Sequence, residues 1–125
     1  MAMAYYDSAR ILLEERIKLS PNEQKYHSSL GIVYARMGMN KEAVQQGILA
    51  TQLMPESLDA WAGYDRQVDL ARIYAITDDT EQAIAKIDYL LSNPGNFSKM
   101  TLEYDPDFDG LRNTQAYKDI LQKEF

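Results

Sequence analysis

Alanine and proline recur at one fixed interval in the first half of the chain. The step from Ala9 to Ala43 equals the step from Pro21 to Pro55. This interval is far longer than the period of a helix or a strand, so it indicates a fold assembled from repeated supersecondary units. One such unit cannot bury its own apolar side, and stacked neighbours are needed to complete a continuous core. We therefore expect a stack of similar units.

The clearest unit lies in the middle of the first half of the chain. Leu30, Gly31 and Tyr34 are three to four positions apart and share one face of a helix. A glycine and an asparagine then interrupt this helix, and a second apolar pattern follows until a proline. The predicted helices span residues 23–37 and 41–53, and the small residues expected at their crossing are Gly31, Ala43 and Ala50.

This pattern resembles the tetratricopeptide repeat (TPR), a helix–turn–helix unit with Leu-Gly, Tyr, Ala, Ala and Pro at these intervals. The interval of the alanines and prolines also matches the TPR period. The resemblance implies an all-α fold, namely a right-handed TPR-type superhelix of helical hairpins with a helical C-terminal cap. Two residues depart from the family pattern. His27 replaces a bulky aromatic residue, and Gly47 replaces a large apolar residue on the second helix.

The resemblance covers residues 1–125 as a single domain. In chain order, residues 4–22 resemble the second helix of an incomplete repeat, 23–56 a full repeat, 57–95 a full repeat with a lengthened first helix, and 96–125 a capping tail. The second full repeat follows the first at a longer interval, which is the same for Leu30 and Leu70 as for Ala43 and Ala83. The lengthened helix is predicted over residues 58–76 with Ser57 as its N-cap. The apolar stripe of the first helix is predicted to be Ala9, Leu12, Leu13 and Ile17.

The tail from Leu102 to Arg112 resembles a recurrent ending of bacterial TPR arrays. Such arrays often end proteins that begin with a cyclase, a protein kinase or a winged-helix regulator, so the resemblance implies the C-terminal part of a larger bacterial protein. Short helices are predicted after Ser98 and after Asn113 or Thr114. The residues predicted to cover the last repeat are Leu102, Phe108, Leu111, Tyr117 and Leu121.

The charge of the chain excludes one class of partner and favours another. A net charge of −6 argues against nucleic-acid binding, because no basic face is available to neutralise phosphates. Residues 1–62 carry 6 basic and 7 acidic side chains, whereas residues 63–125 carry 7 and 12. A charged partner of the second half should therefore be basic. The absence of cysteine favours a reducing compartment, which we take as the cytoplasm, and no stretch suggests a membrane span.

Stacked hairpins curve, and the first helix of each unit lines the concave side. We expect a protein or peptide partner to bind there. The residues expected to contact it are Lys25, Ser28, Ile32, Arg36, Trp61, Asp65, Val68 and Arg72. Two interpretations of Trp61 remain open: an exposed anchor at the rim of a groove, or a core residue folded over the neighbouring helices.

The chain offers few side chains for catalysis or metal binding. Asp105, Asp107 and Asp109 match the opening of an EF-hand calcium loop, but Ala116 occupies the position that requires a bidentate glutamate. His27 is expected to be a packed, hydrogen-bonded residue, since a metal site needs further ligands close by. With one histidine and no cysteine, the usual acid–base and nucleophile groups are scarce. We expect no enzyme activity, no cofactor and no metal.

The sequence therefore favours a non-catalytic protein–protein interaction module. The alternative is a structural or regulatory C-terminal appendage of a larger bacterial cyclase, kinase or transcriptional regulator. Such an appendage would form a dimer or pack against another domain of its own chain. The incomplete first repeat favours this alternative, because its open edge requires either a preceding helix or a second copy.

Overall fold

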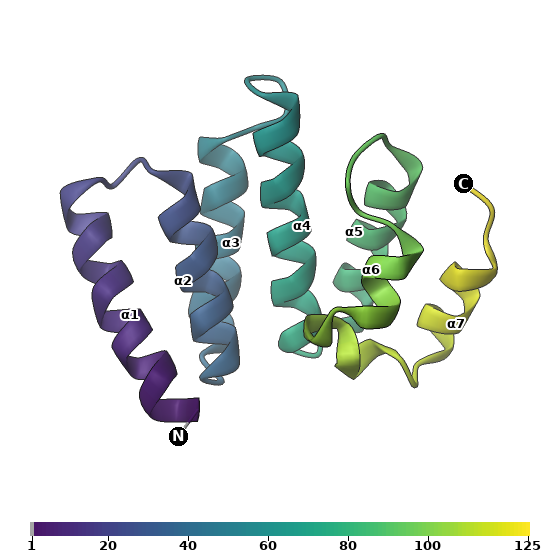
Figure 1. Cartoon of the computed structure of the whole chain (residues 1–125), viewed down its shortest axis with the longest axis horizontal. Coiled ribbons are helices and arrows are strands. Elements are labelled where there is room, and N and C mark those ends of the chain that lie inside the picture. The colour runs from purple at the N-terminus through teal and green to yellow at the C-terminus, as the bar shows by residue number, and fades with distance from the viewer. Residues whose placement is uncertain (1) are drawn as a thin grey trace.

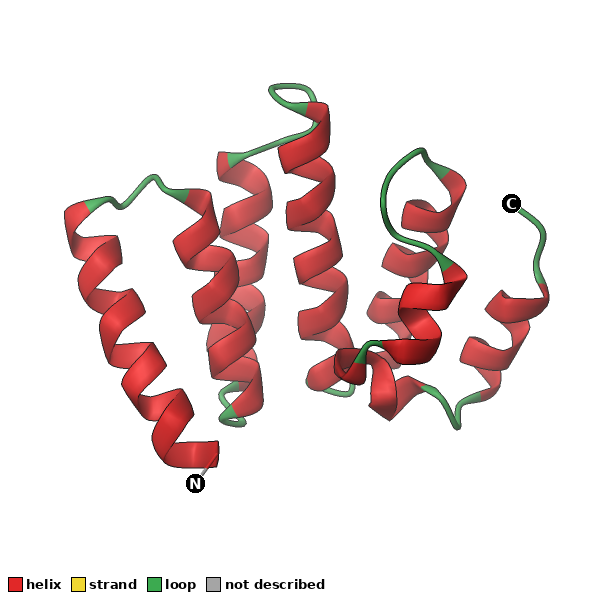
Figure 2. Cartoon of the chain, viewed as in Figure 1, coloured by secondary structure: helices red, strands yellow, loops and turns green. Residues whose placement is uncertain are grey.

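A computed structural model describes residues 2–125, and these residues form helices and connecting turns without a strand (Figure 2). The helices are α1 (Ala2–Leu19), α2 (Gln24–Arg36), α3 (Asn40–Leu53), α4 (Ala60–Ile76), α5 (Thr80–Ser92), α6 (Lys99–Tyr104), the 3-10 helix η1 (Pro106–Leu111) and α7 (Gln115–Gln122). The chain is all-α, as the sequence predicts.

The helices follow one another in a row from the N-terminus to the C-terminus (Figure 1). From α1 to α5, each helix packs against the next one in the chain. Helix α2 also contacts α4, so two helices that are not consecutive lie side by side in front of α3 and α5. The tail then returns to this stack, where η1 packs on α4, and α7 packs on α5.

Small residues lie where the helices cross. Ala43, Ala50, Ala71 and Ala83 are fully buried. A Cβ atom added to Gly31 would lie 2.7 Å from Ile73 Cδ1 of α4 and 3.1 Å from the backbone oxygen of Ala43. The backbones of α2 and α3 therefore approach closely, and a side chain of α4 fills the space at their crossing.

The departure from the repeat pattern at Gly47 has a packing cause. A Cβ atom at this position would lie 2.8 Å from both Leu70 Cδ1 and Ile73 Cδ1. The volume that a large apolar residue would occupy in α3 is therefore filled by two side chains of α4. The core stays filled, but the residues that fill it come from the next helix.

Local signals in the tail are confirmed. Ser98 caps α6 through a capping box with Thr101, and Thr114 caps α7 by accepting a hydrogen bond from the backbone of Tyr117. Outside the tail, Asp79 caps α5 by accepting a hydrogen bond from the backbone of Gln82.

Helix α4 begins at Ala60 rather than at Leu58, and Asp59 replaces Ser57 as its N-cap. The oxygen of Pro55 accepts hydrogen bonds from the backbone of Leu58 and Asp59 at 3.0 and 3.2 Å, which closes a turn before the helix. The carboxylate of Asp59 then accepts from the backbone of Trp61 and Ala62, both at 3.0 Å. The predicted start is therefore wrong, because a side chain that satisfies two backbone donors ends the turn there.

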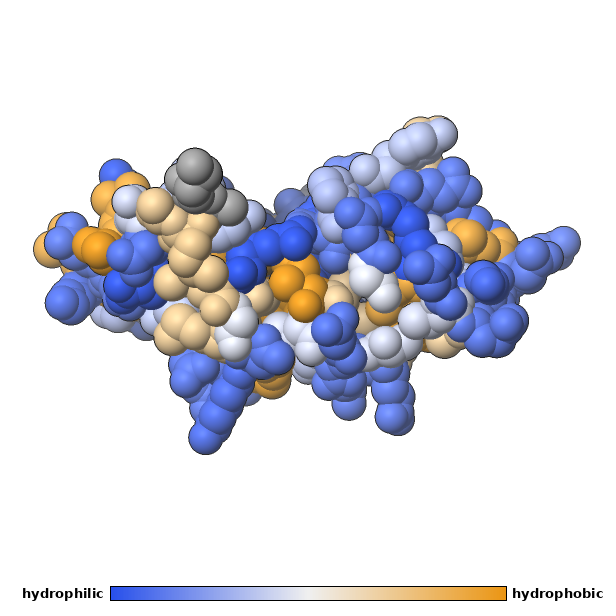
Figure 3. Space-filling model, turned by 90° about the horizontal axis from the view of Figure 1, so that it is seen from below, coloured by the Kyte–Doolittle hydropathy of each residue, from blue (hydrophilic) through white to orange (hydrophobic). Residues whose placement is uncertain are grey.

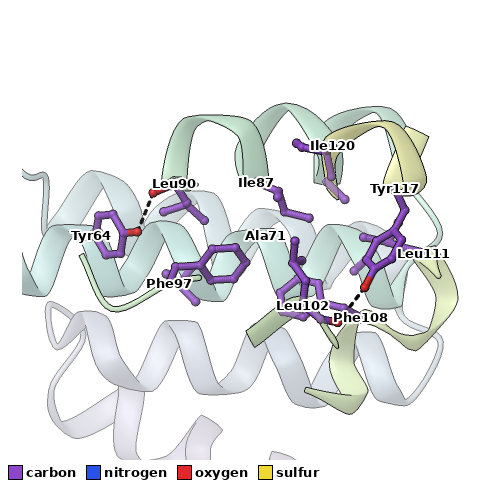
Figure 4. Close-up of a cluster of buried hydrophobic side chains, with 13 residues drawn as sticks. Tyr64, Ala71, Ile87, Leu90, Phe97, Leu102, Phe108, Leu111, Tyr117 and Ile120 are labelled. Carbon is purple, nitrogen blue, oxygen red and sulfur yellow. Dashed lines mark hydrogen bonds between the residues drawn. The ribbon is translucent and has the colours of Figure 1, made fainter. Parts of the chain in front are cut away.

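The larger core cluster joins α4 and α5 to the tail (Figure 4). We call it the C-terminal core. Its members are Tyr64, Val68, Ala71, Ala75, Ala83, Ile87, Leu90, Phe97, Leu102, Phe108, Leu111, Tyr117 and Ile120. The burial predicted for Leu102, Phe108, Leu111 and Tyr117 is confirmed, whereas Leu121 is only partly buried.

Helix α1 is less buried than predicted. Leu12, which was assigned to its apolar stripe, is 50% exposed, and Leu19 is 86% exposed. The cause is that α1 lies at the end of the row, where α2 is its main neighbour among the described helices. One neighbouring helix covers only part of its circumference.

Candidate functional site

A hollow of about 350 Å³ opens between α4 and the beginning of the tail. Its lining includes three residues expected from the sequence, Asp65, Val68 and Arg72, together with Asn96, Phe97 and Thr101. Hydrophilic side chains cover much of the face seen from below, and hydrophobic ones appear between them in several places (Figure 3). We take the hollow and the residues at its rim as the candidate site.

A continuous network of charged side chains crosses this face. Arg66 of α4 donates to Gln24 of α2 at 2.7 Å and pairs with Asp69 at 3.1 Å. Arg72 donates to Asp69 at 3.2 Å and to Asp105, at the start of η1, at 3.0 Å. We call these residues the arginine–aspartate network. Its members are Gln24, Arg66, Asp69, Arg72 and Asp105, together with Asp107 and Arg36.

The network ends on α2, because Asp107 of η1 also pairs with Arg36. A second contact of Asp107, to Arg72 Nε at 3.5 Å, connects the two arginines. Three arginines and three aspartates therefore neutralise one another and bind the tail to both α2 and α4. Arg36 and Arg72, which the sequence assigned to a partner, serve this internal contact.

Two of the expected contact residues are buried. Ser28 is 2% exposed, and Val68, at 9%, belongs to the C-terminal core. Helix α2 packs against α1, α3 and α4, and α4 packs against α2, α3, α5 and η1. Because α2 and α4 have neighbours on several sides, they bury more of their circumference than was assumed when a concave, partner-facing stripe was predicted.

The remaining expected residues reach the surface to different extents. Lys25 and Asp65 are exposed, and Ile32 is partly buried beside Ala35. No cation among residues 2–125 pairs with Asp65, although it lies one turn from the network. Asp65 is thus a free carboxylate at the rim of the hollow.

Trp61 is exposed, which decides between the two interpretations of this residue. Its relative exposure is 69%, and it lies one helical turn before Asp65 on α4. The Asp59 cap holds the first turn of the helix, so the backbone that carries the ring is fixed. A large aromatic side chain on a fixed backbone beside a free carboxylate is suited to contact with another polypeptide.

His27 is a packed residue, as the sequence predicts. It is buried, and its ring nitrogens make hydrogen bonds with Gln46 Oε1 at 2.6 Å and with the Pro21 oxygen at 2.7 Å. Both nitrogens are therefore engaged within the fold. Within residues 2–125, no three histidine, aspartate or glutamate side chains are grouped so that they could hold a metal ion.

Gln24, Arg66 and Asp69 of the network were not predicted from the sequence. A signal for part of it was present, since Arg66, Asp69 and Arg72 are each three positions apart, as paired charges on a helix are. Their link to Asp105 had no such signal, because Arg72 lies 33 positions before it in the chain. That contact depends on where the tail returns to the fold.

Replacement of Arg72 by alanine is expected to lower the free energy of unfolding by about 1–3 kcal/mol, because Asp69, Asp105 and Asp107 would then repel one another with one cation fewer among them. Urea unfolding measures this loss. Lys118→Ala, an exposed change on α7, is the control and should have almost no effect. Equal stability of the wild type and Arg72→Ala would show that the network does not hold the tail.

None of the helices described is both long and apolar enough to cross a membrane. Comparison of the chain with protein-family models, with curated proteins and with solved structures finds no match.

Proposed function

We propose that this chain is a non-catalytic protein-interaction module built as a TPR-like stack of helical hairpins. Three observations support the architecture. The pairs α2–α3 and α4–α5 are consecutive packed helices, α2 packs on α4 as the first helices of neighbouring repeats do, and glycines or alanines occupy the crossings.

The observation that carries the interaction is the pair Trp61 and Asp65 at the exposed end of α4. Trp61 offers a large apolar ring that is still in contact with water, and Asp65 offers an unpaired charge one turn away. Burial of the ring by a partner segment would remove apolar area from water, and the carboxylate would orient a polar or basic group of that segment. The partner is a peptide segment of another protein.

A peptide library displayed on phage and selected on the immobilised full chain tests this proposal. Selected peptides are expected to bind Trp61→Ala and Asp65→Lys at least about tenfold more weakly than the wild type, which corresponds to the loss of one good anchor. Tyr104→Ala is the matched control, since Tyr104 is an exposed aromatic residue of the tail. Equal affinity of the peptides for the Trp61→Ala, Asp65→Lys double variant and the wild type would refute the site.

A second function is favoured by the exposed apolar side chains of α1. Its largely exposed apolar residues are Met3, Tyr5, Ile11, Leu12 and Leu19. A surface of this kind on one helix indicates contact with another body. The corresponding function is a structural appendage that forms a dimer, or packs against another domain, through α1.

Under this second function, the molar mass of the wild type measured by light scattering is expected to rise with concentration towards that of a dimer. Leu12→Glu should restore the monomer, because a charge would then have to be buried between the two copies. Leu12 is half exposed, so this change leaves the fold intact. A wild type that remains a monomer at every concentration would count against dimerisation.

A further inference from the structure

A second hollow, also of about 350 Å³, opens where the beginning of α4 faces the end of α5. We call it the aromatic pocket. Its lining residues are Glu56, Ala60, Trp61, Tyr64, Tyr89, Asn93 and Pro94. Three aromatic rings and one carboxylate therefore surround a single opening, and the ring of Trp61 is mostly exposed to water.

The position of Glu56 is determined by Gly63. A Cβ atom added to Gly63 would lie 2.5 Å from the backbone nitrogen of Glu56, so the turn before α4 can press against the helix only because this residue is glycine. Tyr89 of α5 donates a hydrogen bond from its hydroxyl group to the Glu56 carboxylate. This bond raises the pKa of Tyr89 above its ordinary value, so the phenol remains a donor at neutral pH.

The opposite side of the pocket is held by hydrogen bonds of Tyr64 and Asn93. The Tyr64 hydroxyl donates to the oxygen of Leu90 at 2.8 Å, and the amide of Asn93 donates to the oxygen of Tyr89 at 2.8 Å (Figure 4 shows the first). Gly95 lies directly against the Tyr64 ring, where an added Cβ atom would be 2.2 Å from it. These hydrogen bonds and the contact of Gly95 therefore fix the positions of the residues that line the pocket.

No basic side chain among residues 2–125 lines this pocket. Lys86 interacts with the charge of Glu56, but its amino group donates a hydrogen bond to Gln67 at 2.6 Å. Burial lowers the pKa of Lys86, and the charge of Glu56 only partly opposes this shift. The amino group of Lys86 is thus hydrogen-bonded to Gln67, and Glu56 has no ion-pair partner among residues 2–125, so its charge is available to an incoming group.

The chemistry of these walls selects one kind of occupant. An apolar group would take the Glu56 carboxylate out of water without a cation to balance its charge, which is costly. An ammonium or guanidinium group satisfies the carboxylate through a charge-assisted hydrogen bond and contacts the faces of the rings, which attract cations. The acidity of residues 63–125 favours the same charge at longer range.

We propose that the aromatic pocket binds the cationic side chain of a lysine or arginine carried by the partner segment. This inference rests on the proposed function and deepens it, since it names the group that the partner inserts beside Trp61. The aliphatic part of the side chain packs on the Trp61 ring, and its charged end reaches Glu56.

The emission of Trp61, the only tryptophan of the chain, tests the proposal without a known partner. The probes are short alanine peptides that carry one central lysine, arginine, acetyl-lysine or norleucine. The lysine and arginine peptides are expected to change the emission in a saturable way. The two neutral peptides should bind about tenfold more weakly, as expected for the loss of a cation–π contact and a charged hydrogen bond.

Two variants identify the source of this selectivity. Glu56→Gln keeps an acceptor for Tyr89 but removes the charge, so its preference for charged over neutral peptides should fall to the smaller contribution of the aromatic rings. Glu15→Gln makes the same change of net charge on α1 and should behave as the wild type. Melting followed by circular dichroism verifies that both variants fold. Equal responses to charged and neutral peptides, or unchanged selectivity in Glu56→Gln, would overturn the proposal.

Failure of this proposal can be told apart from failure of the proposed function. Selected peptides that depend on Trp61 and Asp65, but bind equally well when their basic residues are replaced, leave the function in place and remove the cation pocket. Peptides that ignore both residues remove the function, whatever the alanine peptides show.

Discussion

A chain that ends at Asn96 is expected to lose its cooperative unfolding transition and to aggregate. The tail supplies Phe97, Leu102, Phe108, Leu111, Tyr117 and Ile120 to the C-terminal core. Burial of a large apolar side chain contributes about 1.5–3 kcal/mol, so these residues together contribute as much as the whole stability of a typical domain. Without them, the buried residues of α4 and α5 would face water. Thermal unfolding and sedimentation velocity measure the two effects.

The control for this truncation is a chain that ends at Lys123. It lacks only Glu124 and Phe125, which are exposed, and should unfold in one transition like the wild type. A soluble chain ending at Asn96 that unfolds in one sharp transition would show that the tail is an accessory and that helices α1 to α5 have a sufficient core of their own.

Phe108→Ala is expected to lower the free energy of unfolding by about 3–5 kcal/mol, the usual range for loss of a buried phenylalanine. Phe108 has no exposed surface and meets Phe97 edge to face, with ring centroids 5.6 Å apart. Its ring lies in the C-terminal core, so the change leaves a cavity there. The midpoint of urea unfolding measures the loss.

Tyr104→Ala provides the comparison, because Tyr104 is an aromatic residue of the same tail with 77% of its surface exposed. We expect this variant to differ from the wild type by less than about 0.5 kcal/mol. Similar losses for the two variants would mean that the tail acts through its chain length rather than through the packing of Phe108.

Features that depend on neighbouring residues in the sequence could be predicted. Ser98, Asp79 and Thr114 each precede a helix and cap it, and the capping interaction needs only the next few residues. The burial of Phe108 was also predicted, from the expectation that the tail covers the last repeat. Even so, the start of α4 was misplaced, because Ser57 and Asp59 are both good caps and a backbone turn decides between them.

The exposure of individual side chains on α2 and α4 could not be predicted. Ser28 and Val68 were expected to face a partner and are buried, whereas Trp61 could have been either. Each outcome depends on how far a helix is rotated about its axis and on how many helices surround it. A helical pattern fixes which residues share a face, but it does not state which neighbours cover that face.

The full arginine–aspartate network could not be predicted from the sequence for a related reason. The spacing of Arg66, Asp69 and Arg72 suggests ion pairs within one helix, and both of these exist. The partners on the tail are far away in the chain: Asp105 lies 33 positions after Arg72, and Asp107 lies 71 positions after Arg36. Charged residues at such separations can pair in many ways, and only the path of the tail selects Asp105 and Asp107.

The contact of Arg36 with Asp107 joins residues 71 positions apart in the chain. In a simple stack each unit contacts only its neighbours, so the bend of the stack can open and close. Here the ion pair between α2 and η1 limits how far this curvature can change. For the proposed interaction, this means that the surface around Trp61 and Asp65 is held in place before binding, so a partner would bind it at a lower entropic cost than it would a flexible array.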